Sequence, residues 1–388
     1  MLCFVPRPDT GIFATFQSGS RTMLKTFRYR LVPNKTQRDK LQRTLDSCRF
    51  LYNCALEQRR SQRLGIYEQK RQLTEVRHSF NEYKDIHVHV LQNTLFKLDR
   101  AFQAFFRRCR NGEKPGFPRF KNENGFDSFA FNNTGFKLQG KILSLCKIGN
   151  VKVRLSRPLP KDSTIKALTV KRVCGAWYAC LAVEYTPTPL PASDKAVGID
   201  LGLESFAALS NGERIGNPRF LEKNARELRR AQRRVARRQK GSHRRRKAVL
   251  RLQKVHERIR NRRLDWLHKR STELIRKYGL IVAEELHIRG LAQGVLAKQV
   301  LDAGWATFLD MVSYKAAEAG RRFEKVEPKY TSQTCPACGA VKKKKLSERM
   351  HRCDCGYQIH RDIAAAQVIL GRICPLGANV AEVVASVA

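Results

Sequence analysis

The run Ala196-Val197-Gly198-Ile199-Asp200-Leu201-Gly202 decides how the second half of this chain is interpreted. Its apolar residues end in an aspartate with a glycine close behind, which is typical of a short buried strand. A similar apolar run, 280–283, ends in Glu284. A third acid, Asp362, opens the alanine-rich run 363–370, which a glycine closes, so that run is predicted to be a helix.

Two carboxylates at strand ends and one at a helix start, in a strongly basic protein, indicate a metal site for phosphodiester chemistry. Carboxylates are hard oxygen ligands that suit Mg²⁺. Two such ions roughly 3.5–4 Å apart can stabilise the attacking and the leaving oxygen of an in-line displacement. A single acid at a strand end is more often a turn or cap residue, and periodicity alone does not bring three distant acids together. The rest of the chain must therefore support the site.

The composition indicates a polyanionic partner. The 388 residues suffice for two or three domains, and 76 Lys and Arg against 34 Asp and Glu give a formal charge of +42. Such a chain repels itself unless a polyanion is bound, so we expect nucleic acid, held with salt-sensitive affinity. A membrane is the alternative, but we find no apolar run of about 18 residues and no lipidation signal.

The start of the chain and the cysteines point to a reducing cytoplasm. Residues 1–22 lack periodicity and a continuous apolar core, so we interpret them as a loose tail rather than a secretory signal, with Met23 as an alternative start. Of twelve cysteines, four cluster near the C-terminus and the others are scattered singly. This distribution favours one metal site over a disulfide framework.

The first half predicts a β-domain interrupted by helices. A strand over 25–32 precedes a long helical region that runs, with breaks, to about residue 110. From 126 to 185, short runs separated by Gly, Asn or Pro predict a small antiparallel domain, with a barrel as the expected shape. Strand 25–32 is its expected partner, which makes the helical region an insertion. Three prolines between 187 and 191 form a linker.

Between the helices and the β-domain, residues 111–121 read NGEKPGFPRFK. The prolines and glycines exclude a helix here. Basic side chains alternate with Phe117 and Phe120, a combination that suits a nucleic-acid strand through phosphate contact and base stacking. A merely basic loop is an equal alternative. The candidate contacts are Lys114, Arg119 and Lys121.

An arginine-rich stretch follows the Asp200 strand. Its arginines recur at intervals of three and four, which on a helix places them on one stripe. Charge runs are often solvated faces, but here no acids at i+4 offset the repulsion, which costs helix stability. We therefore favour phosphate contact for Arg226, Arg229, Arg230, Arg233, Arg234, Arg237 and Arg238.

Further elements continue an alternating pattern. Gly241 and Ser242 break the arginine helix, a second helix runs from about 244 to 278, another covers 304–319, and a strand covers 323–326. Strands alternating with helices from residue 196 onward argue for an α/β or α+β core like that of ribonuclease H.

Four cysteines close the pattern. Cys335 and Cys338 form one pair, Cys353 and Cys355 a second, tighter one, and a glycine follows each pair as a knuckle turn requires. Four thiolates predict a closed, tetrahedral, structural Zn²⁺ site. His351 and His360 flank it, but four sulfurs suffice.

These motifs, in this order, resemble TnpB, the RNA-guided nuclease encoded by transposon insertion sequences and a relative of the type V CRISPR effectors. The similarity runs from about Met23 to Leu370. It is carried by Gly198-Ile-Asp-Leu-Gly202, Asn217-Pro-Arg-Phe-Leu221, Val282-Ala-Glu-Glu-Leu286, Tyr330-Thr-Ser-Gln-Thr-Cys335-Pro-Ala-Cys338-Gly339, His351-Arg-Cys-Asp-Cys-Gly356, and Arg361-Asp362 with Ala365-Ala366.

The resemblance implies an α+β multidomain protein. A wedge-like β-barrel would comprise 23–33 and 119–190, with a helical recognition lobe, 34–118, inserted in it. A RuvC-type, RNase H-like nuclease domain would cover 191–388, with a four-cysteine zinc ribbon inserted at about 328–359.

The resemblance also implies the activity. Asp200, Glu284 and Asp362 would hold Mg²⁺ (or Mn²⁺) in an RNA-guided endodeoxyribonuclease, with Glu285 as the alternative to Glu284. A guide RNA from the transposon end would pair with double-stranded target DNA, while the protein reads an adjacent motif and duplex shape. We expect a monomer in a prokaryotic cytoplasm, acting at the nucleoid and not at a membrane.

The third motif departs from the family pattern. His360 stands where the family commonly has an acid, and Ala364 where it has an asparagine that helps to fix the site. A nuclease-inactive, RNA-guided DNA-binding protein is therefore an alternative. A strand-joining transposase is a further alternative, although we find no convincingly placed Tyr or Ser nucleophile.

Overall fold

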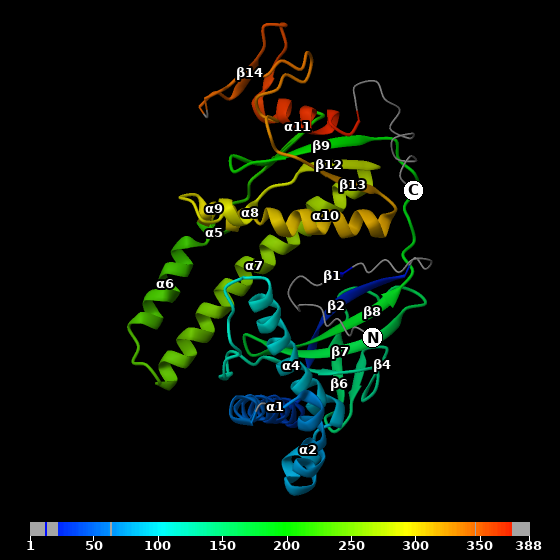
Figure 1. The fold of residues 1–388 in the computed structure, drawn as a ribbon, viewed down its shortest axis with the longest axis vertical. Coiled ribbons are helices and arrows are strands. Elements are labelled where there is room, and N and C mark those ends of the chain that lie inside the picture. The colour runs from blue at the N-terminus through cyan, green and yellow to red at the C-terminus, as the bar shows by residue number, and fades with distance from the viewer. Residues whose placement is uncertain (1–11, 14–21, 63, 346, 375–388) are drawn as a thin grey trace. The chain divides into compact units, whose positions relative to one another are not determined.

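The computed structural model describes residues 12–13, 22–62, 64–345 and 347–374, and the chain forms two compact units, Met1–Thr186 and Pro187–Ala388 (Figure 1). The predicted tail, 1–22, lies outside the described residues except for positions 12–13 and 22. Within it, β1 (Ile12–Phe13) pairs with β2 (Met23–Val32).

The sheet of the first unit follows the order β3-β7-β8-β2-β6-β5-β4, and its pairs are antiparallel. The predicted pairing of the first long strand with the later ones is confirmed, because β2 lies between β8 and β6. The described pairings leave β3 and β4 as edges, so closure into a barrel stays a prediction. The sequence pattern missed β4. The later strands are β3 (Ser128–Phe131), β4 (Phe136–Gln139), β5 (Ile142–Leu145), β6 (Gly149–Arg154), β7 (Thr164–Val173) and β8 (Ala176–Tyr185).

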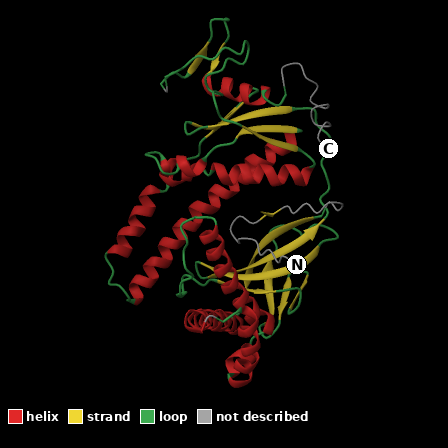
Figure 2. Cartoon of the chain, in the orientation of Figure 1, coloured by secondary structure: helices red, strands yellow, loops and turns green. Residues whose placement is uncertain are grey.

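Helices occupy the sequence between β2 and β3 (Figure 2). Leu41, Leu91 and Leu98 of these helices share one buried cluster with Phe131 and Val170 of the sheet. The helices and this sheet therefore bury their apolar faces against each other. The helices are α1 (Lys35–Gln62), α2 (Ile66–Ser79), α3 (Asn81–Lys84) and α4 (Val88–Arg110).

The second unit is built on a mixed sheet of order β11-β10-β9-β12-β13. Three neighbours, β9, β12 and β13, run parallel, and β10 and β11 are antiparallel additions at one edge. The strands predicted at 196–200, 280–283 and 323–326 are confirmed as β9, β12 and β13, and β10 and β11 complete the sheet. The strands are β9 (Ala196–Leu201), β10 (Ser205–Leu209), β11 (Arg214–Gly216), β12 (Leu280–Glu284) and β13 (Arg322–Val326).

Helices cover both faces of this sheet, which explains why its central strands read as continuous apolar runs. Ile199 and Ala283 point into a cluster with residues of α7 (His243–Lys277) and α10 (Trp305–Ala319). On the other face, Leu280 and Val282 contact Ile369 of α11 (Arg361–Gly371). Figure 1 shows α11 on one side of β9 and β12, with α7 and α10 on the other.

The arginine-rich helix is shorter than predicted. α6 ends at Ala236, so Arg237 and Arg238 lie beyond the helix. The chain reverses direction here, with Gly241 in the left-handed region and Ser242 capping α7 through the Arg245 N–H, and this reversal requires the first helix to stop early. The remaining elements are α5 (Phe220–Lys223), α6 (Ala225–Ala236), α8 (Ile288–Leu291), α9 (Ala297–Ala303), β14 (Met350–Arg352) and β15 (Gln358–His360).

No helix within the described ranges combines the length and apolarity needed to cross a membrane.

Candidate metal centre and nucleic-acid surfaces

The parallel register of β9 and β12 brings two of the predicted acids side by side. Gly198 pairs with Val282 and Ile199 with Ala283, so the next step places Asp200 beside Glu284. Side chains alternate between the faces of a strand. Because Ile199 and Ala283 face α7 and α10, the two acids face α11.

The third acid comes from α11, whose backbone rests directly on β9. A Cβ atom at Gly198 would lie 2.0 Å from the Ala366 carbonyl oxygen and 2.9 Å from the Leu370 nitrogen. Only glycine permits this approach. Asp362 lies in the first turn of α11, one turn before Ala366, and His360 caps the helix by accepting the Asp362 N–H at 3.3 Å. The helix therefore delivers its acid to the face that carries Asp200.

Burial and the neighbouring acids both act on the titration of Asp200. Burial raises the pKa of Asp200 to about 8, and the negative charges of Glu284 and Asp362 add to this effect, while Arg361 opposes it. Burial also raises the pKa of Glu284, and the Thr331 hydroxyl and Arg372 partly offset that rise. A buried carboxyl beside two other acids is costly to ionise unless a cation neutralises its charge.

The donor set fits a hard divalent cation, since it consists of carboxylate oxygens. Among the described residues, only the four cysteines have their ligand atoms all within 4.8 Å of one another. The oxygens of the three acids are therefore farther apart than this without a bound ion. Glu285 is exposed and its backbone N–H donates to the Val326 carbonyl at 2.8 Å. The face and burial of Glu284 therefore favour it over Glu285 as a ligand.

The four predicted cysteines form one cluster, with their sulfurs all within 4.8 Å of one another. The Sγ–Sγ distances are 3.8 Å for Cys335 and Cys355 and 3.5 Å for Cys338 and Cys353. A tetrahedral Zn²⁺ with Zn–S bonds of about 2.3 Å needs sulfurs about 3.8 Å apart. The cluster therefore fits zinc.

A basic groove of about 660 Å³ lies between α6 and α7. Arg230, Arg234 and Arg238 line it, and the first two are called the groove pair below. Arg229 and Arg233, the outer pair, are exposed but do not line it. The seven predicted arginines thus do not share one face. Sequence reasoning missed the α7 side of the groove, although the spacing of its basic residues was a usable signal. That side presents Arg244, Lys247, Arg251, Lys254 and Arg258.

In the first unit, the predicted basic and aromatic loop has no helix and is held at one end. Asn53 brackets Lys121, accepting its N–H at 2.8 Å and donating to its carbonyl at 3.0 Å. Phe117 and Phe120 remain about half exposed, and Arg60 stacks on Phe120 at 5.4 Å from the ring centroid. The two other candidates, Lys114 and Arg119, are both exposed residues of this loop.

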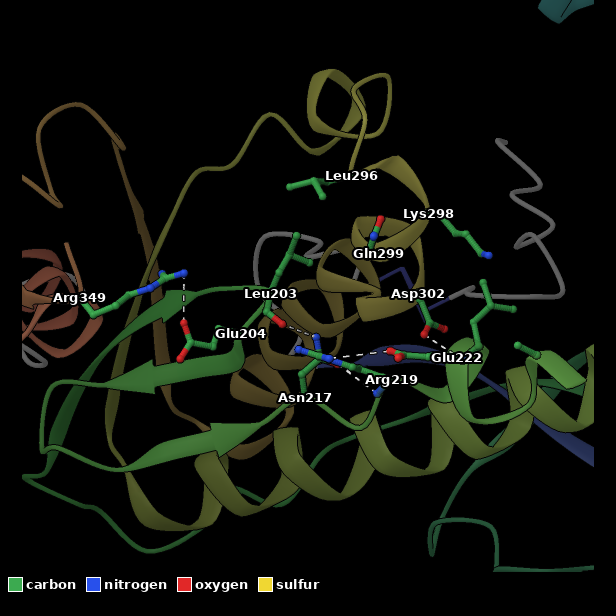
Figure 3. A pocket seen from close by; sticks show the side chains of 12 residues that line it. Leu203, Glu204, Asn217, Arg219, Glu222, Leu296, Lys298, Gln299, Asp302 and Arg349 are labelled. Atoms are coloured by element: carbon green, nitrogen blue, oxygen red, sulfur yellow. Dashed lines mark hydrogen bonds and ion pairs between the residues drawn. The ribbon is translucent and has the colours of Figure 1, made fainter. Parts of the chain in front are cut away.

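A pocket of about 650 Å³ in the second unit lies beside the loop that follows β9 (Figure 3). Arg349 pairs with Glu204 at 3.3 Å across its rim, and the Asn217 side chain donates to the Leu203 carbonyl at 3.0 Å. Asp302 of α9 accepts the Leu221 N–H at 2.9 Å. The motif 217–221 therefore builds a wall of this pocket.

Comparisons with known proteins fit this arrangement. A family model described as "Probable transposase" (OrfB_IS605) matches residues 180–294, and "Cas12f1-like, TNB domain" matches residues 305–369. A third model, "Helix-turn-helix domain", matches 23–64, residues that here form mainly β2 and the single helix α1.

Two relatives align over most of both chains. "Putative RNA-guided DNA endonuclease" of Streptomyces pristinaespiralis is 36% identical, covering 89% of this chain and 88% of its own. "Putative RNA-guided DNA endonuclease InsQ" of Escherichia coli (strain K12) is 30% identical, covering 89% and 92%. The chain therefore belongs to the TnpB (OrfB) family.

The fold is also similar to that of a solved structure. The protein in "Cryo-EM structure of the Cas12f1-sgRNA-target DNA complex" superposes with a TM-score of 0.57 at 13% sequence identity, covering 90% of this chain and 99% of that one. This likeness supports an α+β multidomain architecture of the Cas12f and TnpB kind.

Proposed function

We propose that this protein is an RNA-guided DNA endonuclease that hydrolyses phosphodiester bonds at Asp200, Glu284 and Asp362. The observation that carries the proposal is the convergence of these acids, from two neighbouring strand ends and one helix start, where burial and then the charges of Glu284 and Asp362 raise the pKa of Asp200. The RNA guide and the DNA target are inferred from the names of the two relatives that align over most of both chains.

The acids would hold Mg²⁺ or Mn²⁺, and two such ions would activate water and stabilise the leaving oxygen. The chain itself contributes the frame. Gly198 lets α11 lie on β9, the β9–β12 register aligns the two strand-end acids, and burial keeps bulk water from screening their charges. The strand order of the sheet, with acids on its α11 face, supports an RNase H-like (RuvC) domain over 191–388.

The remaining assignments follow from the same proposal. Residues 23–33 with 119–190 would form the wedge domain, 34–118 the recognition lobe, and 328–359 the zinc ribbon with Zn²⁺ on its four cysteines. The guide RNA would derive from the transposon end, and the complex would act as a monomer in a prokaryotic cytoplasm. Lys114, Arg119 and Lys121 of the loop in the first unit would contact the nucleic acid.

We also infer that the groove between α6 and α7 follows a phosphate backbone. Of its twelve lining residues, eight are Arg or Lys and one is acidic, and that acid, Glu227, is already paired with Arg258 at 2.9 Å. Unpaired cations facing each other across a groove are stabilised when a polyanion replaces their counterions. Of the seven arginines predicted to contact phosphates, Arg230, Arg234 and Arg238 line this groove and can contact one nucleic-acid strand together.

The test is plasmid cleavage by protein purified with RNA co-expressed from the flanking element. Wild type should cut a plasmid that carries the matched target and the adjacent motif, in the presence of Mg²⁺. Asp200→Ala should abolish cutting and leave RNA binding intact, whereas Glu285→Gln, an exposed neighbour of the site, should cut like wild type. Unchanged cutting by Asp200→Ala would end the assignment.

A nuclease-inactive DNA-binding protein is the second candidate, favoured by Ala364. The methyl side chain of Ala364 has no amide that could hydrogen-bond to the acids, and the residue is buried, with 1% of its surface exposed. His360 caps α11 instead of adding an acid. Stable, guide-dependent binding of the target by wild type in Mg²⁺, without any product, would favour this candidate over the nuclease.

A further inference from the structure

The zinc ribbon is joined to the acid site at both of its ends. Its entry segment follows β13 and passes Glu284, where the Thr331 hydroxyl donates to the Glu284 carboxylate. Its exit strand, β15, runs without interruption into α11, so that Asp362 is the second residue after the ribbon's last strand residue. The ribbon is therefore connected to two of the three acids, Glu284 through Thr331 and Asp362 through β15.

Thr331 is held in place from several directions. Its side chain is 3% exposed, and its hydroxyl also lies 3.1 Å from the Pro328 carbonyl oxygen. Arg372, at the end of α11, donates to the carbonyls of Glu327 and Lys329, two residues that shortly precede Thr331 in the sequence. The segment that carries Thr331 is therefore fixed to the same helix that carries the third acid.

A tight turn connects Thr331 to the first zinc ligand. Tyr330, in the left-handed region with φ of 62°, offers its carbonyl to the Gln333 N–H at 2.9 Å and the Thr334 N–H at 3.0 Å. Cys335 follows this turn directly, is 1% exposed, and donates its N–H to the Ala340 carbonyl at 2.8 Å. Little freedom remains between the Cys335 sulfur and the Thr331 hydroxyl.

We propose that Thr331 is a positioning residue for the acid site, and that the zinc ribbon acts through it to orient Glu284. This inference rests on the proposed metal-dependent nuclease function. A carboxylate ligand that is not held by an outer partner can rotate, and loss of such a partner typically weakens metal binding roughly 10- to 100-fold. Thr331 itself binds no metal and touches no substrate in this assignment.

The test compares Thr331→Val, which keeps the shape and removes the hydroxyl, with Thr331→Ser, which keeps the hydroxyl. Binding of Mn²⁺ to the guide-loaded protein is measured by titration calorimetry, with Asp200→Asn giving the background. We expect Thr331→Val to weaken Mn²⁺ binding by about 10-fold or more and Thr331→Ser to restore it. Zinc content, RNA binding and the unfolding midpoint should change little in either variant.

Thr334→Val is the matched control, because its hydroxyl donates to the Tyr330 carbonyl at 2.9 Å in the same turn. It removes a hydroxyl hydrogen bond near the zinc ligands without contacting Glu284, and it should bind Mn²⁺ like wild type. Equal Mn²⁺ affinity of Thr331→Val and wild type would overturn the proposal, as would an equal loss in Thr334→Val. If Asp200→Asn still cut DNA, the nuclease assignment itself would fail, so the two failures are distinguishable.

Discussion

Replacing Asp200 by asparagine should stabilise the metal-free protein while it removes cleavage. The carboxyl has a pKa of about 8 in the folded chain and 3.8 as its ordinary value. Between these values the unfolded chain binds fewer protons than the folded one, so rising pH favours unfolding. The loss of stability begins near the lower pKa, grows through neutral pH and levels off above the higher one. Asparagine keeps the shape and removes this titration.

The magnitude follows from the same two pKa values. Each pH unit between them costs about 1.4 kcal/mol, so the penalty at pH 7 reaches up to about 4 kcal/mol. For a unit of roughly 200 residues this corresponds to a rise in Tm of roughly 10 °C for the metal-free variant. The difference between variant and wild type should vanish near pH 4, where the carboxyl is neutral in both states.

The assay is thermal unfolding in chelator, from pH 4 to pH 9, for wild type, Asp200→Asn and Glu285→Gln. The exposed control should follow wild type at every pH. Added Mn²⁺ should raise the Tm of wild type, because the ion binds only the folded state, and should do so much less for Asp200→Asn. A variant that is no more stable than wild type at pH 7, or a difference that does not depend on pH, would refute the reasoning.

Three further outcomes are expected. Changing both residues of the groove pair to glutamine should weaken RNA binding at 0.2 M salt by roughly 10-fold or more, and should lower the slope of log affinity against log salt by about 1 to 2. The same change in the outer pair should have a smaller effect. Equal effects of the two pairs would contradict a role for the groove in RNA binding. Gly198→Ala should destabilise the second unit by about 3 kcal/mol or more and reduce cleavage, because its Cβ would meet the Ala366 carbonyl oxygen. Gly216→Ala is the control and should change the Tm little, because no atom lies within 4 Å of the added carbon. Removal of zinc from the guide-loaded protein by a chelator at low concentration should lower cleavage about 10-fold or more while RNA binding persists. Cleavage that is independent of zinc content would contradict a role for the ribbon.

Much of the acid site could be predicted from local signals. Asp200 and Glu284 each end a run of apolar residues of strand length, and Asp362 opens an alanine-rich helix, so their element types follow from pattern alone. Their choice as a group could not be made this way, since residues 162 positions apart share no local signal. The family resemblance supplied that grouping, and the β9–β12 register supplied its geometry.

Other features depended on contacts that no local pattern contains. The stripe of arginines was predicted as one face, but the early end of α6 and its pairing with α7 divide it into a groove and an outer surface. Thr331 stands in a motif noted for its cysteines, and nothing in its neighbourhood in sequence indicates that it contacts Glu284. Such contacts form between segments 47 residues apart, where the chain's tertiary path decides which side chains meet.

The amino-acid sequence alone determined the basic charge, the cysteine pairs, the order of most strands and helices, and the positions of the acids at their ends, because these depend on composition, spacing and periodicity. The tertiary structure decided which face each acid takes, how α11 comes to rest on Gly198, and which arginines share a groove. The physical reason is that burial and hydrogen bonding act between neighbours in space, and the closest neighbours of Glu284 and Gly198 lie far away along the chain.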